Sequence, residues 1–120
     1  MVSHLTAATF KEKVFNFEGN KEWKFEGSKP CMIDFYANWC GPCKTVAPIL
    51  EELSTEYGEK IDIYKVNTDN EQELAGLFGI TSIPSILFVP MLKEPTITTG
   101  VIPKESFNKA IKELFDIDKE

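Results

Sequence analysis

The stretch that decides the fold is Cys31-Met-Ile-Asp-Phe-Tyr-Ala37, which runs directly into Asn38-Trp-Cys40-Gly-Pro-Cys43-Lys44. Its first part is almost continuously apolar, which is typical of a β-strand buried on both faces of a sheet. From Cys40 to about Gly58, apolar side chains recur at helical spacing with Pro48 among them, so we expect a long helix with a proline kink. A buried strand that leads through a short loop into a helix indicates an α/β sheet.

The rest of the chain continues this alternation of strands and helices. Thr6 is a candidate N-cap for a helix whose apolar face, at roughly helical spacing, would consist of Phe10, Val14, Phe15 and Phe17. Further strands are predicted at 2–5, 61–66, 85–89 and 96–99, and further helices at 71–78 and 106–115. Residues 18–30 are rich in Gly, Ser and Pro and are predicted to be a loop with a short extended piece at 23–25. The pattern predicts a sheet covered by helices on both faces.

Length and charge limit the classes of function. A chain of 120 residues is the usual size of one compact domain, so we expect a single domain over residues 1–120. The net charge of −6 disfavours binding to nucleic acid or to anionic membranes, which both require basic patches. The most apolar stretch, 80–92, is too short to span a membrane and is interrupted by two prolines. The N-terminus does not read as a secretory signal, so we expect a cytoplasmic protein, or a periplasmic one if a leader has been removed.

Two cysteines separated by two residues, Cys40 and Cys43, are the candidate reactive groups. Cβ atoms three residues apart inside a helix are about 5–6 Å apart, whereas a disulfide requires about 3.5–4.5 Å. Cys40 at the N-cap, where the backbone is not yet helical, resolves this difficulty and puts Pro42 in the first turn. A helix N-terminus stabilises a thiolate, so we expect Cys40 to be the nucleophile. Cys43, one turn further in and more buried, would resolve the mixed disulfide.

Two other uses of the pair are disfavoured. Half of a zinc site would need two more ligands, and the remaining candidates, Cys31 and His4, do not form a paired ligand motif, so no metal is expected. A purely structural disulfide would close so small a loop that it would stabilise the folded state very little.

The chain resembles the thioredoxin family over nearly its whole length. The resemblance rests on Asp34-Phe-Tyr-Ala-Asn-Trp-Cys-Gly-Pro-Cys-Lys44, on Pro48, on Lys65-Val-Asn-Thr-Asp69, on Ile83-Pro-Ser85 and on Gly100, in the family's order and spacing. It implies a thioredoxin fold, with a central mixed β-sheet of four to five strands flanked by about four helices.

The resemblance also implies roles for residues around the cysteines. Asp34 matches the buried carboxyl that accepts and donates the proton of the second cysteine, a task that suits a carboxyl whose pKa is raised by burial. Lys65 matches the family's lysine and could hold Asp34 ionised, although it could equally be a surface lysine at a strand end. The Ile83–Pro84 bond is expected to be cis. A substrate-binding surface is expected from Trp39, Gly41, Pro42, Ile83, Pro84 and Gly100.

Some positions depart from the family pattern. Tyr36 stands where many members have tryptophan, and residues 90–95 predict a different loop in the last hairpin. Residues 18–29 resemble an insertion in which Trp23 and Phe25 would cover a sheet edge. Cys31 is an extra cysteine; an apolar strand favours a buried, inert thiol over a regulatory one.

The sequence therefore predicts a protein-disulfide reductase that maintains the redox balance of the cell. The Gly41-Pro42 dipeptide resembles that of reducing members, and no histidine lies near the pair to make its disulfide more oxidising. The expected partners are protein disulfides and a thioredoxin reductase as electron donor; we expect a monomer and no cofactor. The alternatives are a dedicated relay for one partner, in the periplasm for example, and a binding subunit that uses the fold without turnover.

Overall fold

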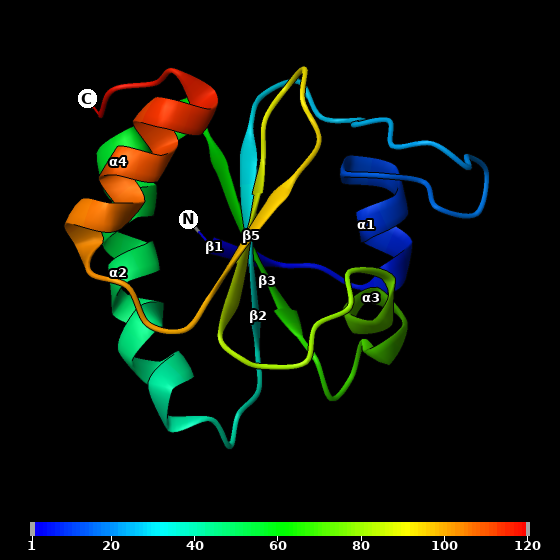
Figure 1. Cartoon of the computed structure of the whole chain (residues 1–120), viewed down its shortest axis with the longest axis horizontal. Coiled ribbons are helices and arrows are strands. Elements are labelled where there is room, and N and C mark those ends of the chain that lie inside the picture. The colour runs from blue at the N-terminus through cyan, green and yellow to red at the C-terminus, as the bar shows by residue number, and fades with distance from the viewer. Residues whose placement is uncertain (1, 120) are drawn as a thin grey trace.

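A five-stranded sheet forms the centre of the molecule, with helices on both faces (Figure 1). The computed structural model describes residues 2–119. In the strand order β1-β3-β2-β4-β5, β3 pairs in parallel with β1 and β2, and β4 pairs antiparallel with β2 and β5. The strands are β1 (Val2–His4), β2 (Cys31–Tyr36), β3 (Asp62–Asn67), β4 (Ser85–Val89) and β5 (Thr96–Thr99). The sheet is therefore mixed, as predicted.

The helices form one layer on each side of this sheet. Helices α2 and α4 cover one face, and α1 and α3 cover the other (Figure 1). Their bounds are α1 (Ala7–Lys13), α2 (Gly41–Tyr57), α3 (Gln72–Leu77) and α4 (Lys104–Phe115), and a 3₁₀ turn, η1 (Gly58–Lys60), follows α2. Pro48 lies inside α2, as expected. This arrangement confirms the predicted α/β class and the thioredoxin fold.

Each face of the sheet has its own hydrophobic core, because alternate residues of a strand point to opposite faces. On β2, Met32 joins the cluster beneath α2 and α4, whereas Ile33 and Phe35 join the cluster beneath α1 and α3. All of these side chains are buried. By the same alternation, Asp34 points to the face covered by α2 and α4, as Met32 does. Its carboxyl group therefore lies in an otherwise apolar layer.

Helix α1 begins where the sequence predicts and ends earlier than its apolar pattern suggests. Thr6 caps it, since its side chain accepts a hydrogen bond from the Thr9 N–H. The last turn closes when the N–H groups of Val14 and Phe15 both donate to the Phe10 carbonyl oxygen. Val14 and Phe15 are buried even so, because the chain turns beneath the sheet after Lys13. The apolar spacing of residues 10–17 therefore indicates which side chains are buried, and it does not indicate where the helix ends.

The segment 18–30 is a loop, as predicted, and the extended piece expected at 23–25 forms no strand. The Trp23 ring lies 4.8 Å from that of Phe15 and 6.4 Å from that of Phe78. Trp23 and Phe25 pack against the core cluster beneath α1 and α3, so they cover a face of the sheet. Both side chains also line a hollow together with residues 91–94, which lead into the edge strand β5. That they cover a sheet edge therefore stays a prediction.

Candidate active site

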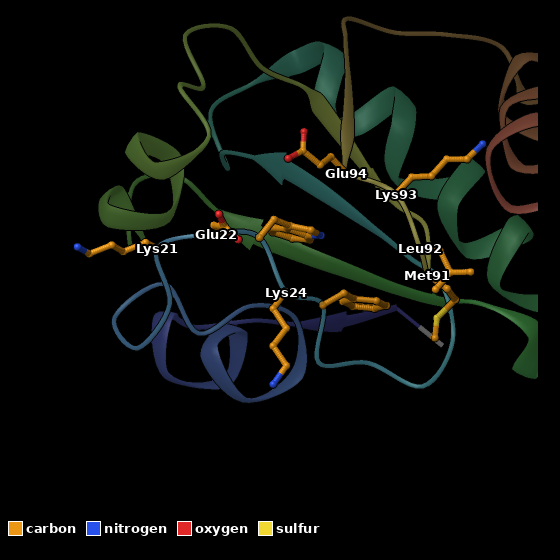
Figure 2. A pocket seen from close by; sticks show the side chains of 9 residues that line it. Lys21, Glu22, Lys24, Met91, Leu92, Lys93 and Glu94 are labelled. Atoms are coloured by element: carbon orange, nitrogen blue, oxygen red, sulfur yellow. The ribbon is translucent and has the colours of Figure 1, made fainter.

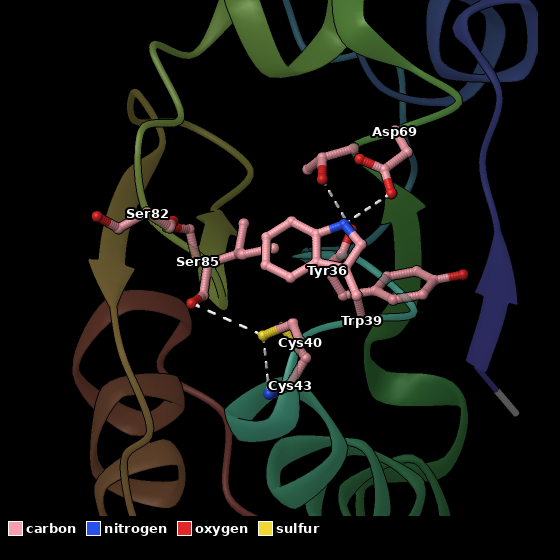
Figure 3. The surroundings of a disulfide bond; sticks show 9 residues. Tyr36, Trp39, Cys40, Cys43, Asp69, Ser82 and Ser85 are labelled. Atoms are coloured by element: carbon pink, nitrogen blue, oxygen red, sulfur yellow. Dashed lines mark hydrogen bonds between the residues drawn. A yellow bond between two sulfur atoms is a disulfide. The ribbon is translucent and has the colours of Figure 1, made fainter.

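Cys40 and Cys43 are joined by a disulfide at the start of α2 (Figure 3). Cys40 is the N-cap, with the extended torsions φ −87° and ψ 110°, and the two Cα atoms are 5.3 Å apart. This separation is within the usual range for a disulfide. The Cys43 N–H donates a hydrogen bond of 3.2 Å to the Cys40 sulfur. The sulfur of Cys40 thus receives an N–H at the positive end of a helix, the arrangement that favours a thiolate.

Burial does not distinguish the two cysteines. Cys40 is 3% exposed and Cys43 is 4% exposed, so the expectation that Cys43 is the more buried of the two is wrong. Ala37 and Ile83 pack around the pair and cover Cys40 as well. The two differ in their surroundings: the Cys40 Sγ lies 3.9 Å from the Ile83 carbonyl oxygen, whereas Cys43 lines a pocket that contains Asp34.

Sheet register brings two further segments beside the pair. Ser85 of β4 is in register with Phe35 near the end of β2 and with Thr99 at the end of β5. The residues just before Ser85 and just after Thr99 therefore meet near the loop that holds Cys40. The Ile83–Pro84 bond is cis, which confirms the prediction.

Gly100 closes this side of the site. Its N–H donates a hydrogen bond of 2.8 Å to the Pro84 carbonyl oxygen. Its φ of +95° is a conformation that favours glycine, and a Cβ at this position would project into open space. A chain segment that docks here can therefore approach the backbone closely.

Trp39 is the most prominent apolar group at the site, with 70% of its surface exposed. Its Nε1–H donates a hydrogen bond of 2.9 Å to Oδ2 of Asp69 (Figure 3). Sequence reasoning placed Trp39 at the surface and assigned no role to Asp69. The position of Asp69 could have indicated this contact, because an acidic side chain two residues beyond the end of β3 can reach the neighbouring loop. Gly41 and Pro42 are also exposed, Ile83 is half-buried and Pro84 is buried.

Asp34 lies in a small pocket beneath the cysteines. The carboxyl is 1% exposed, and neither of its oxygens has a hydrogen-bond partner within residues 2–119. Burial raises the pKa of Asp34 to about 7, and the positive charge of Lys65 partly opposes this shift. The pocket has a volume of about 160 Å³ and is lined by Asp34, Tyr36, Ala37, Asn38, Cys43, Lys44, Ala47 and Lys65. It is polar and large enough for water molecules between Asp34 and Cys43.

Lys65 is in register with Asp34 on the adjacent strand, yet no ion pair joins them within the described part of the chain. The Lys65 ammonium lies over the ring of Tyr36, 4.7 Å from its centroid. A cation over an aromatic face is stabilised by about 0.5–1 kcal/mol at an exposed site and by about 2 kcal/mol when desolvated. The direct ion pair between Lys65 and Asp34, which was one of two possibilities from the sequence, is therefore not formed.

A larger hollow lies at the opposite end of the sheet (Figure 2). It has a volume of about 720 Å³ and lies between residues 21–25 and residues 91–94. Because Cys31 and Val89 are in register at that end, the hollow is separated from Cys40 by the length of β2. Its lining contains lysine, glutamate and apolar side chains and no cysteine or histidine. It is not the site of the redox chemistry.

The third cysteine, Cys31, is 1% exposed and unpaired. Burial raises its pKa well above the usual range for a thiol, and the nearby charge of Asp62 adds to the shift. Its surroundings match the inert thiol that the sequence favoured. Within residues 2–119, no group of three or more His, Cys, Asp or Glu side chains is placed to hold a metal ion.

Comparison with known proteins agrees with this geometry. The chain matches the family model "Thioredoxin" over residues 1–113. It is 46% identical over 115 residues to a thioredoxin of Borreliella burgdorferi, covering 96% of this chain and 98% of that protein. It is 32% identical over 110 residues to thioredoxin 1 of a Nostoc species (92% and 94%), and 42% identical over 80 residues to a thioredoxin of Bacillus subtilis (67% and 77%). In the described part of the chain, no helix is long and apolar enough to cross a membrane.

Proposed function

This chain belongs to the thioredoxin family and is a thiol–disulfide oxidoreductase, and we propose the following division of labour among its residues. The observation that supports it best is the position of Cys40 at the N-cap of α2, with the Cys43 N–H directed at its sulfur. This setting supports dithiol–disulfide exchange, and we assign to this chain the reduction of protein disulfides. Neither a dedicated relay nor a non-catalytic subunit is favoured, because the relatives are thioredoxins and the pair is intact.

Cys40 is the nucleophile and Cys43 the resolving cysteine. The Cys40 thiolate attacks one sulfur of a client disulfide, forms a mixed disulfide and releases the first client sulfur as a thiolate. The Cys43 thiol then loses its proton and attacks the Cys40 sulfur, which breaks the mixed disulfide and releases the second client thiolate. The client gains the two electrons that the Cys40–Cys43 pair loses. The one proton of the pair passes from Cys43 to Asp34, and the two client thiolates take up protons from solvent. The disulfide in the structure corresponds to this product.

Asp34 is the proton acceptor for Cys43, and Lys65 sets the charge beside it. A carboxyl with a pKa of about 7 is half-protonated near neutral pH, so it can accept and return a proton in each cycle. The pocket shared by Asp34 and Cys43 supports transfer through water. The positive charge of Lys65 lowers the cost of ionised Asp34.

The client binds across the surface around Cys40. An extended segment would pair with the Ile83 backbone and pack against Trp39, Pro42 and Gly100. This assignment is supported by the exposure of Trp39, by the 3.9 Å between Cys40 Sγ and the Ile83 carbonyl oxygen, and by the open space above Gly100. Gly41 is exposed and has no side chain that would obstruct the client, and Pro84, which is buried, would contribute by positioning the Ile83 backbone through its cis bond.

In the cell, a thioredoxin reductase returns two electrons to the pair, and the protein acts in the cytoplasm as a monomeric single domain over residues 1–120. The Gly41-Pro42 dipeptide supports the reducing direction, because nothing at these positions adds a positive charge that would stabilise the dithiol further. By keeping client thiols reduced, the protein supports cellular redox homeostasis.

Equilibration with glutathione tests the direction of electron flow. The protein is incubated in buffers with a graded ratio of reduced to oxidised glutathione, and the fraction of Cys40–Cys43 disulfide is measured by mass spectrometry after acid quenching. We expect the pair to remain mostly oxidised at ratios typical of the cytosol, as for a strong reductant. Ready reduction of the pair by glutathione at those ratios would contradict the reductase assignment.

Turnover is tested separately with insulin as the disulfide substrate and dithiothreitol as the electron source. The wild-type protein should accelerate insulin reduction, and Cys40→Ser should reduce the rate to the uncatalysed level. Cys31→Ala is the matched control, since it removes a buried cysteine outside the site and should retain the wild-type rate. Full activity in Cys40→Ser would end the catalytic assignment.

A further inference from the structure

A row of polar residues crosses the sheet on the face covered by α2. His4 of β1 is in register with Lys65 of β3, and Lys65 is in register with Asp34 of β2. Register partners in parallel strands project to the same face, so the row leads from an exposed edge strand to the buried carboxyl. Tyr36 lies two residues after Asp34 on β2 and therefore projects to this face as well.

The Tyr36 ring contacts two members of this row. The Lys65 Nζ lies 4.7 Å from the ring centroid, and the Tyr36 hydroxyl lies 3.4 Å from Nδ1 of His4. The rings of His4 and Tyr36 meet edge to face, with centroids 6.1 Å apart. Burial raises the pKa of Tyr36, although a hydrogen bond from Asn67 opposes the shift. The phenol therefore stays neutral at physiological pH, and its ring face remains available to a cation.

Lys65 has two alternatives to this position. Because it is the register partner of Asp34 and its side chain is long and flexible, it could reach the carboxyl and form a direct ion pair, or it could extend into solvent. The structure shows neither arrangement. Lys65 and Tyr36 both line the pocket of Asp34, and the ammonium lies over the Tyr36 ring while the carboxyl oxygens stay without a partner in the described chain.

We propose that Tyr36 is a positioning residue whose ring holds the Lys65 ammonium beside the pocket and away from ion-pair contact with Asp34. The proposal rests on the proposed function, because it concerns the proton that Asp34 exchanges with Cys43. A direct ion pair would keep Asp34 ionised through neutral pH and leave it a poor proton donor. With the ammonium on the ring, Asp34 feels the positive charge and still titrates in the working range.

The charged and titratable groups around Asp34 come from three elements. Tyr36 lies on its own strand, Lys65 on β3, and Cys43 and Lys44 on α2. His4 of β1 is reached through the Tyr36 hydroxyl. Of these groups, Lys65 is the one whose charge lowers the pKa of the carboxyl, so the influence of Tyr36 on Asp34 should pass through Lys65.

A double-mutant cycle tests this path. The pKa of Asp34 is measured in the oxidised protein by NMR titration of its ¹³C-labelled carboxyl, which requires no turnover. Tyr36→Leu removes the ring and should lower the Asp34 pKa by about half a unit or more, because Lys65 is then free to pair with the carboxyl. Tyr36→Phe keeps the ring and should retain the wild-type pKa. In a Lys65→Met background, Tyr36→Leu should leave the pKa unchanged.

The kinetic consequence is measured in a second experiment on the same variants. The rate at which Cys43 resolves a preformed mixed disulfide on Cys40 is followed between pH 5 and pH 9. The inflection that reports Asp34 should move to lower pH in Tyr36→Leu and stay in place in Tyr36→Phe. Tyr36→Met provides a second variant without a ring if the leucine variant does not fold.

Three results would overturn the proposal: an unchanged Asp34 pKa in the ring-free variants, a raised one, or an equal shift with and without Lys65. The last result would mean that Tyr36 acts through packing or solvation alone. Failure of the proposed function would look different, since insulin reduction by the wild-type protein would then be absent whatever the Asp34 titration shows.

Discussion

The indole N–H of Trp39 donates a hydrogen bond to the carboxylate of Asp69, which lies thirty residues further along the chain. Trp39 is 70% exposed, and this is the one hydrogen bond that ties its side chain to the body of the protein in the described structure. A large ring beside a nucleophile must be held in place if clients are to meet a defined surface. We therefore expect Asp69 to orient Trp39 without taking part in the chemistry.

Asp69→Ala should loosen Trp39 and lower kcat/KM for insulin reduction about two- to tenfold, as expected for the loss of one hydrogen bond of about 0.5–1.5 kcal/mol. The chain has two tryptophans, so a Trp23→Phe background leaves Trp39 as the single emitter. In that background, acrylamide should quench Trp39 fluorescence more strongly in Asp69→Ala than in Asp69→Asn, which keeps an acceptor oxygen. Identical quenching and activity in the two variants would show that the bond is dispensable.

Cys43→Ser should accumulate mixed disulfides with clients. The Cys40 thiolate would still attack, and no second thiol would be placed within reach of its sulfur, since Cys31 is buried elsewhere in the core. Non-reducing electrophoresis after incubation with oxidised insulin should reveal a covalent adduct that dithiothreitol removes. The reverse outcome, with adducts in Cys40→Ser and none in Cys43→Ser, would exchange the roles of the two cysteines.

Asp34→Asn should stabilise the oxidised protein at high pH. Asp34 ionises near pH 4 in an unfolded chain and near pH 7 in the folded protein, so the folded state binds the extra proton between these values. The stability that the protonated carboxyl provides is present at low pH and is lost as the pH rises from about 4 to about 7. Above that range, the raised pKa of Asp34 corresponds to a loss of roughly 4 kcal/mol of folding stability, which Asp34→Asn would recover.

Guanidinium unfolding of wild type and Asp34→Asn at pH 5 and pH 8 measures this effect. The difference in unfolding free energy between the two proteins should grow by about 2–3 kcal/mol from the lower to the higher pH. Glu59→Gln, at an exposed position in η1, provides the control and should show little pH-dependent change. A stabilisation by Asp34→Asn that is equal at both pH values would mean that the charge of Asp34 is not its source.

Cys31 should resist alkylation in the folded oxidised protein. It is buried and its pKa is raised by desolvation, so its reactive thiolate form is scarce at neutral pH. Mass spectrometry after iodoacetamide treatment at pH 8 should find no label in native protein and one label in denaturant. Rapid labelling of the native protein would instead support a regulatory thiol.

Most of the fold could be predicted because its signals are local. The apolar run 31–37 predicts β2. Beyond it, the apolar residues change between strand-like and helix-like spacing, and this change predicts α2 and the later elements to within a few residues. Helix α1 was harder, since Val14 and Phe15 are buried by a turn and not by a helix, and the same apolar spacing serves both. Trp23 illustrates the same limit: its burial could be expected, but the face that it covers depends on the path of a loop.

The site was predictable in its residues and less so in its contacts. Cys40 at the N-cap follows from geometry that the sequence makes evident, and the cis bond before Pro84 could be expected from resemblance alone. The near-equal burial of Cys40 and Cys43 could not, because it depends on Ile83 packing from a distant segment. The position of Lys65 over Tyr36 likewise depends on which of two nearby partners a flexible chain selects.

The strand order gives the two sides of the client surface different resistance to local opening. Strand β2, which leads to Cys40, is hydrogen-bonded to a neighbour on each side and buried along almost its whole length. Its amides should exchange with solvent deuterium only when the whole molecule unfolds. Strand β5, which leads to Gly100, is an exposed edge strand held by β4 alone. Clients of different shape would therefore be accommodated by fluctuation of the Gly100 side, while the sulfur that attacks them is anchored by the short loop that joins the slowly exchanging strand β2 to α2.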